Sequence, residues 1–358
     1  MFFNLYLCPC KYPEIAKDVC TIMVIDVDNS ENEKRLNLDQ VNEPIFLVCA
    51  ADDRYSMPLT VTARSIIENL KSDRRIVLFI IDGGIKNHNK EKILSSLSSE
   101  NFKVEFVPKP TSLLEDIEEF HKYRKMNGEA EQKHVTIASY YRLLISDLLP
   151  SQIEKVIYLD CDLVVRGDIE KLWQTNLEEH YLLAVPDMWI CSVSHHLGLL
   201  NYKELEISPD SKYFNAGVLV INLQKWRLGK ITTKAVEYLK QKREYVRYHD
   251  QDVLNALLAG QWGEIDPRWN VTPTIHTYSS WRDSPFSEDV YNSLIHEPYI
   301  VHFASHDKPW NSRRTLLKDY FFYYVDMTAW SGWRLTLWRR LWLKLVSELR
   351  NLNLWFGE

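Results

Sequence analysis

Residues 155–162 read KVIYLDCD, a short apolar run that ends in two acidic residues separated by a cysteine. Such a run is typical of a strand that is buried on both faces of a parallel sheet. On an extended backbone, residues i and i+2 point to the same side, so Asp160 and Asp162 can face one ligand together. Open α/β sheets bind ligands beyond the carboxyl ends of their strands, and the pair is predicted to lie there.

Similar apolar runs occur on both sides of this segment, with helical spacing between them. Strands are expected at 44–51, 75–82, 102–108, 155–160, 182–187, 214–223 and 298–304. Helices are expected at 57–70, 86–99, 134–148, 231–243 and 250–259. This alternation predicts βαβ units with right-handed crossovers, and therefore an α/β fold with a mostly parallel sheet flanked by helices.

The composition narrows the class of protein. The chain of 358 residues is 46% hydrophobic and 26% charged, as expected for a globular protein, and its net charge of −6 gives no basic field for nucleic acid. The six cysteines include no CxxC pair, which argues against a disulfide framework or a structural zinc site and favours a reducing, cytoplasmic compartment. The sequence contains no run of about twenty apolar residues, so no membrane-spanning helix is predicted.

The two ends of the chain differ in character from the body at 44–311. Residues 1–43 form an extension of unknown role that ends in a polar segment. Residues 312–358 are rich in Trp and Arg and predict an amphipathic helix, with Trp338, Leu341 and Leu345 on its apolar side. Such a helix can lie in a membrane interface, which we favour, or pack against the body or a second copy.

An Asp-x-Asp pair after a strand has three interpretations. Carboxylates are ligands for hard divalent cations, which commonly bridge to substrate phosphates. Alternatively, Asp162 only caps a turn. The pair also resembles the nucleophile motif of haloacid-dehalogenase phosphatases, which needs a lysine and an acidic pair downstream. Here Asp250 and Asp252 flank Gln251 at the start of a helix and do not form a convincing pair.

Five motifs in order distinguish between these interpretations. They are FLVCAADDRYSMPLTVTARSI, VIYLDCDLVVRGDIEKLW, FNAGVLVINLQKWR, HDQDVLNALLAG and VHFASHDKPW. Together they resemble the family 8 glycosyltransferases over residues 44–311. The resemblance implies a catalytic domain of the Rossmann-like GT-A type. It also implies retaining transfer of a hexose from a UDP-sugar to a glycan, such as lipopolysaccharide or another cell-surface glycan.

The resemblance assigns a metal site. Asp160, Asp162 and His302 match the ligands of a divalent cation in the family. One imidazole beside two carboxylates suits Mn²⁺ somewhat better than Mg²⁺, although Mg²⁺ stays possible. Lys308 matches the lysine that binds the diphosphate, where a positive charge would stabilise the leaving group.

The resemblance also assigns a donor pocket. The matching positions are Ala50, Ala51 and Asp52 for the uracil, with Arg54, Lys133, Arg142, Asn215, Asp250, Gln251 and Ser305 for ribose, phosphate or sugar. Arg54 departs from the small polar residue common in the family, and Ser305 replaces a frequent glycine. Asn215 could instead only begin a strand, and the HDQD segment could only cap a helix.

The implied chemistry centres on Gln251, which lies near the face of the sugar opposite the leaving group. An amide is a poor nucleophile, so we expect the acceptor to attack on the face from which the diphosphate departs, while Asp250 orients the sugar. A sugar-nucleotide-binding protein without transfer activity is the alternative. The choice between galactose and glucose, the acceptor and the oligomeric state stay open, and a peripheral position on the inner face of the cell membrane is expected if the tail binds lipid.

Overall fold

The computed structural model describes residues 43–109, 114–126, 136–339, 341 and 345. The N-terminal extension and most of the predicted tail helix therefore lie outside the described residues. Among the described residues, no helix combines the length and the apolar character that crossing a membrane requires.

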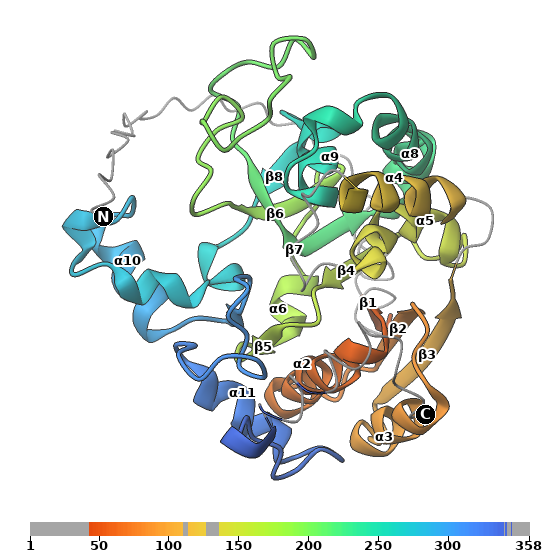
Figure 1. Ribbon diagram of the computed structural model, residues 1–358, viewed down its shortest axis with the longest axis vertical. Coiled ribbons are helices and arrows are strands. Elements are labelled where there is room, and N and C mark those ends of the chain that lie inside the picture. The colour runs from red at the N-terminus through yellow and green to blue at the C-terminus, as the bar shows by residue number, and fades with distance from the viewer. Residues whose placement is uncertain (1–42, 110–113, 127–135, 340, 342–344, 346–358) are drawn as a thin grey trace, which may run out of the picture.

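The body is an α/β fold built on a seven-stranded sheet in the order β3-β2-β1-β4-β7-β6-β8 (Figure 1). The strands are β1 (Ile45–Ala51), β2 (Ile76–Asp82), β3 (Phe102–Pro108), β4 (Lys155–Leu159), β6 (Leu182–Pro186), β7 (Phe214–Asn222) and β8 (Trp262–Glu264). Only β7 runs against its neighbours, so the predicted mostly parallel sheet is confirmed.

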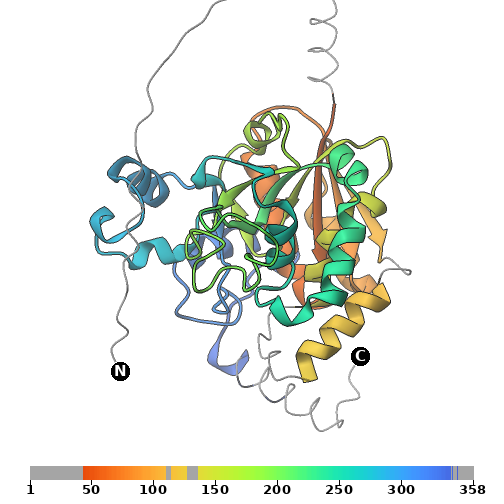
Figure 2. The ribbon, with the colours of Figure 1, turned by 90° about the horizontal axis from the view of Figure 1, so that it is seen from above.

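Helices cover both faces of this sheet. Each strand has apolar side chains on both of its faces, and both faces must therefore be buried. On one face, Val48, Tyr158 and Leu219 pack against the helices α4 (Leu114–Met126), α5 (Ile145–Leu148), α7 (Leu223–Leu228), α8 (Ile231–Gln241) and α9 (His249–Leu258). On the other face, Leu47 and Ile157 pack against α2 (Ser56–Asn69), α3 (Asn87–Ser96) and α6 (Ile169–Trp173). Figure 2 shows α4 and α8 lying side by side on the first face.

The direction of β7 determines which residues meet at one edge of the sheet. The strands β1, β4 and β6 end at this edge with their carboxyl termini, whereas β7 starts there. Residues that follow β4 and β6 therefore lie close to residues that begin β7. This is the edge at which α/β sheets bind ligands.

A separate two-stranded sheet joins the segment after β4 to the end of the body. Its strands are β5 (Leu163–Val165) and β9 (Ile300–His302), which pair antiparallel with Leu163 opposite His302. The run at 298–304 is thus a strand as predicted, but it pairs with β5 and not with the main sheet. The pairing brings His302 next to the residue that follows Asp162.

One helical prediction differs from the structure, and some helices were not predicted. The segment predicted as one helix at 134–148 is a 3₁₀ helix at Ile137–Leu144 followed by the short α5. In a 3₁₀ helix residues three apart lie above one another, and Ser139 and Arg142 accordingly both line the cavity described below. The helices α4, α6 and α7 were not predicted from the sequence.

The chain continues beyond β9 in close contact with the body. Helix α11 (Lys318–Val325) packs Phe321 and Val325 against Val61 of α2 and Val301 of β9. Phe321 and Val325 are fully buried. The exposed apolar side chains Trp338, Leu341 and Leu345 come only after this packed segment. The last helix of the body, α10 (Glu288–His296), packs against the 3₁₀ helices at Pro267–Asn270 and Pro273–Thr277.

Candidate active site

A cavity of about 550 Å³ opens at the edge of the sheet where β1, β4 and β6 end and β7 begins. Its walls come from segments far apart in the sequence, including the start of α9 and the loop after β9. Most side chains in its wall are polar or charged, and several of the charged ones are buried. A cavity of this size and polarity suits a charged small molecule.

Two carboxylates and one imidazole converge in this cavity. Nε2 of His302 lies 3.3 Å from Oδ1 of Asp162 and 3.7 Å from Oδ2 of Asp160. The possible ligand atoms of the three residues all lie within 4.8 Å of one another. Atoms that bind one divalent cation at about 2.0–2.5 Å each lie within about 4–5 Å of one another. The donor set and its spacing therefore fit a divalent cation.

Gly217 makes room for this arrangement. A Cβ atom at position 217 would lie 2.3 Å from Cε1 of His302 and 3.0 Å from Oδ2 of Asp160. No side chain fits there without moving the imidazole. The glycine of the FNAG motif therefore has a steric role beside the predicted metal ligands.

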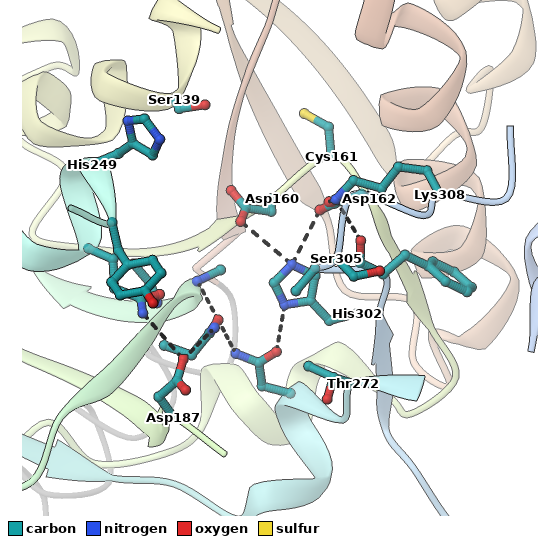
Figure 3. Close-up of a pocket in the computed structure, with 18 of the residues that line it drawn as sticks. Ser139, Asp160, Cys161, Asp162, Asp187, His249, Thr272, His302, Ser305 and Lys308 are labelled. Atoms are coloured by element: carbon teal, nitrogen blue, oxygen red, sulfur yellow. Dashed lines mark hydrogen bonds and ion pairs between the residues drawn. The ribbon is translucent and has the colours of Figure 1, made fainter. Parts of the chain in front are cut away.

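The acidic side chains of the site form ion pairs with buried basic side chains. Nζ of Lys308 binds Oδ2 of Asp162 (Figure 3). It also donates to the carbonyl oxygen of Phe303, and this lysine is only 2% exposed. Burial alone would raise the pKa of Asp162, but Lys308 and His302 outweigh it and hold the pKa well below its usual range. Asp162 is thus ionised at any physiological pH and ready to bind a cation.

Arg142 joins two further carboxylates. Its Nη2 lies 2.6 Å from Oδ1 of Asp160 and its Nε 2.9 Å from Oδ2 of Asp250. Burial would lower the pKa of the guanidinium, but the two carboxylates raise it above its ordinary value. Burial also raises the pKa of Asp250 to about 7, with Arg142 acting in the opposite direction. Arg142 therefore orients Asp160 through Oδ1, while Oδ2 faces His302.

A hydrogen-bonded group of polar side chains occupies the far wall of the cavity. Oδ2 of Asp187 accepts from Nδ2 of Asn215 at 3.1 Å and from Nε2 of Gln251 at 3.2 Å. Oδ1 of Asp187 accepts from the backbone N–H groups of Trp189 and Ile190. Every lone pair of this carboxylate is directed to a donor, so the side chain is rigid.

The structure brings most of the predicted site residues together. Ala50, Ala51, Asp52, Arg142, Asn215, Asp250, Gln251, Ser305 and Lys308 all line the cavity with the three predicted metal ligands. Arg54 is not among the lining residues; it folds back onto Asp52 at 2.8 Å with its side chain 58% exposed. That pairing follows from two side chains of opposite charge two residues apart. Lys133 lies outside the described residues.

Two polar residues of the site were missed at the sequence level. Asp187 is the last residue of a predicted strand, as Asp160 is, and this position was a signal that could have identified it. Asn270 is buried in the wall, and its Oδ1 lies within hydrogen-bond distance, 2.8 Å, of Nδ1 of His302. It lies in a 3₁₀ helix at Pro267–Asn270, and no motif in the sequence marks it.

Comparison with known proteins agrees with this geometry. Residues 46–314 match the profile of Glycosyl transferase family 8. General stress protein A of Bacillus subtilis is 33% identical over 294 residues, which cover 81% of this chain and 96% of that protein. The lipopolysaccharide 1,3-galactosyltransferase of Salmonella typhimurium is 28% identical over 205 residues, 56% of this chain and 57% of that protein.

A solved structure supports the same assignment. The galactosyltransferase LgtC, in complex with donor and acceptor sugar analogs, superposes with a TM-score of 0.66 at 27% identity. The superposition covers 80% of this chain and 96% of LgtC. The fold is therefore of the GT-A type predicted from the sequence, and the chain belongs to glycosyltransferase family 8.

Proposed function

We propose that the protein transfers a hexose, galactose or glucose, from a UDP-sugar to a hydroxyl group of a glycan acceptor, with retention of the anomeric configuration. The convergence of Asp160, Asp162 and His302 in a cavity of suitable size is the observation that carries this proposal. These three residues would hold a divalent cation, for which one imidazole beside two carboxylates favours Mn²⁺.

Positive charge in the cavity would stabilise a diphosphate as it leaves the sugar. A bound cation supplies a counter-charge for the leaving group. Lys308 adds a second positive charge on the same side, and its burial among protein atoms strengthens its interaction with an anion. Asp52, Ala50 and Ala51 line the cavity at the end of β1, where the proposed uracil site lies.

The far wall supports recognition of a sugar and argues against a covalent intermediate. Asp187, Asn215 and Gln251 present a fixed set of donors and acceptors, as buried sugar hydroxyls require. The Asp187 carboxylate accepts four hydrogen bonds and Asp250 is paired with Arg142, so neither is a free nucleophile. Gln251 carries an amide. We therefore favour attack by the acceptor on the face that the diphosphate leaves, with proton transfer to the departing phosphate oxygen.

The proposed acceptor is a lipid-linked or cell-surface glycan such as lipopolysaccharide. The name of the Salmonella typhimurium relative supports this class of acceptor. A peripheral position on the inner face of the membrane would follow from the predicted tail helix. Of its predicted apolar side, Trp338, Leu341 and Leu345 are described and exposed.

The test is release of UDP from UDP-galactose and UDP-glucose, with and without Mn²⁺ and a glycan acceptor. Asp162→Asn should lower the rate at least about 100-fold, because it weakens binding of the cation that would stabilise the leaving group. Asp326→Asn is the matched control, since Asp326 also pairs with a cation but lies at the surface beside Arg334. Full activity in Asp162→Asn would refute the proposal. Binding of UDP-sugar without any UDP release would favour a protein that binds but does not transfer.

A further inference from the structure

The imidazole of His302 has two nitrogens, and they face different surroundings. Nε2 faces Asp160 and Asp162 (Figure 3). Nδ1 lies 2.8 Å from Oδ1 of Asn270. A neutral imidazole carries its hydrogen on one nitrogen only, and only the other can bind a metal. The position of this hydrogen therefore decides whether His302 can be a metal ligand through Nε2.

The amide of Asn215 has a single possible orientation. Its Oδ1 accepts from the backbone N–H of Gly217 at 3.0 Å, and its Nδ2 donates to the carboxylate of Asp187 at 3.1 Å. A backbone N–H can only donate, and a carboxylate that already accepts from two other N–H groups can only accept. Exchanging the oxygen and nitrogen of Asn215 would break both hydrogen bonds.

The orientation of Asn215 determines that of Asn270 in turn. Oδ1 of Asn215 lies 2.9 Å from Asn270, which must present its Nδ2 as the donor. The Oδ1 of Asn270 then faces His302, and an amide oxygen can only accept. Nδ1 of His302 must therefore carry a hydrogen, so a neutral ring, as a metal ligand must be, keeps the lone pair of Nε2 on the side of the two aspartates.

We propose that Asn270 is a positioning residue that sets the tautomer and ring orientation of His302, and that its own orientation is set by Asp187 through Asn215. The proposal rests on the metal-binding role proposed above for His302. Metal-binding histidines commonly donate their second N–H to a fixed acceptor, which orients the ring. Here the acceptor is an amide at the end of a directional chain of hydrogen bonds.

Burial makes this chain effective. Asn270 is 8% exposed and His302 is 3% exposed, so water does not compete for their hydrogen bond. The same chain begins at Asp187, which also accepts from Gln251 on the wall proposed to bind the sugar. One connected set of hydrogen bonds thus links the proposed sugar wall to the proposed metal ligands.

The tautomer can be read directly in metal-free protein by NMR. Protein labelled with ¹⁵N-histidine is studied by long-range ¹H–¹⁵N correlation at a pH where the rings are neutral, and the His302 signals are those missing from His302→Gln. The wild type should show a protonated Nδ1. In Asn270→Leu this preference should be lost. Asn201→Leu is the control, because Asn201 is also buried and its Oδ1 accepts from Tyr238, away from the cavity.

Metal binding gives a second measurement that does not depend on catalysis. Titration with Mn²⁺, followed by electron paramagnetic resonance, should show about 10–100-fold weaker binding in Asn270→Leu and unchanged binding in Asn201→Leu. Asn270→Asp keeps an acceptor oxygen and should retain both the Nδ1–H tautomer and metal binding. Asn270→Ser, whose hydroxyl does not reach the ring, replaces the leucine variant if that protein does not fold.

The outcomes separate this inference from the proposed function. A protonated Nδ1 and wild-type Mn²⁺ affinity in Asn270→Leu or Asn270→Ser would overturn the role of Asn270, and so would loss of the tautomer in Asn270→Asp. Absence of sugar transfer by the wild type would instead contradict the proposed function, and would leave the tautomer measurement unaffected.

Discussion

Replacement of Gly217 by alanine is a steric test of the metal site. The new Cβ would lie 2.3 Å from Cε1 and 2.9 Å from Nδ1 of His302. Carbon atoms in contact lie about 3.5 Å apart, so the ring or the strand must move by about 1 Å. The ring has little freedom to move, because Asn270 binds it on the opposite side from the aspartates.

A displacement of this size is large for a metal ligand. Metal–ligand distances vary by only about 0.2 Å, so a shift of about 1 Å removes His302 from the coordination sphere. We expect Mn²⁺ affinity to fall at least about 10–100-fold, which is about 1.4–2.8 kcal/mol of binding free energy. Crowding should also lower the free energy of unfolding by about 1–3 kcal/mol.

The assay compares Mn²⁺ binding by Gly217→Ala and Gly229→Ala. A Cβ at position 229 would lie 2.7 Å from Cε1 of Tyr181, so the control is similarly crowded but lies outside the cavity lining. Both variants should unfold at lower temperature than the wild type, whereas only Gly217→Ala should lose metal affinity. A folded Gly217→Ala protein that binds Mn²⁺ like the wild type would refute the steric reasoning.

Three further predictions concern pH, charge and the tail. Because burial raises the pKa of Asp250 to about 7 from its usual value near 4, the native state loses stability as pH rises through this interval. The Tm of Asp250→Asn minus that of the wild type should therefore increase between pH 5 and pH 8, and a constant difference would contradict the shift. Lys308→Met leaves the Asp162 carboxylate without its buried partner, so Mn²⁺ should raise the Tm of this variant more than that of the wild type; an equal rise would argue against a cation at Asp162. A protein ending at Thr336 keeps the packed helix α11 and should lose flotation with anionic vesicles that the full chain retains; equal flotation would remove the membrane role.

Much of the fold was predictable because each of its central strands is a run of consecutive apolar residues in the sequence. The segments 44–51, 75–82 and 155–160 are buried on both faces, and their hydrophobic residues identify them without any tertiary information. The winding of 137–144 as a 3₁₀ helix was not predictable from spacing. It depends on packing between the sheet and α9, which local sequence does not describe.

The site was predictable where it depends on motifs and unpredictable where it depends on contacts. The pair Asp160 and Asp162 follows from strand geometry, and the place of His302 beside it was implied by family resemblance. Asn270 becomes part of the site only because β9 and the segment before it lie side by side. Lys308 was expected at the diphosphate, and its direct contact with Asp162 is a result of the three-dimensional structure.

The central claim is that one divalent cation binds between the carboxylates of Asp160 and Asp162 and the imidazole of His302. Crystals grown with Mn²⁺ and UDP, measured at the manganese absorption edge, test this claim most directly. The account predicts one strong anomalous peak within bonding distance of all three side chains and of the diphosphate. A peak elsewhere, or a bound diphosphate with no manganese beside these residues, would contradict it.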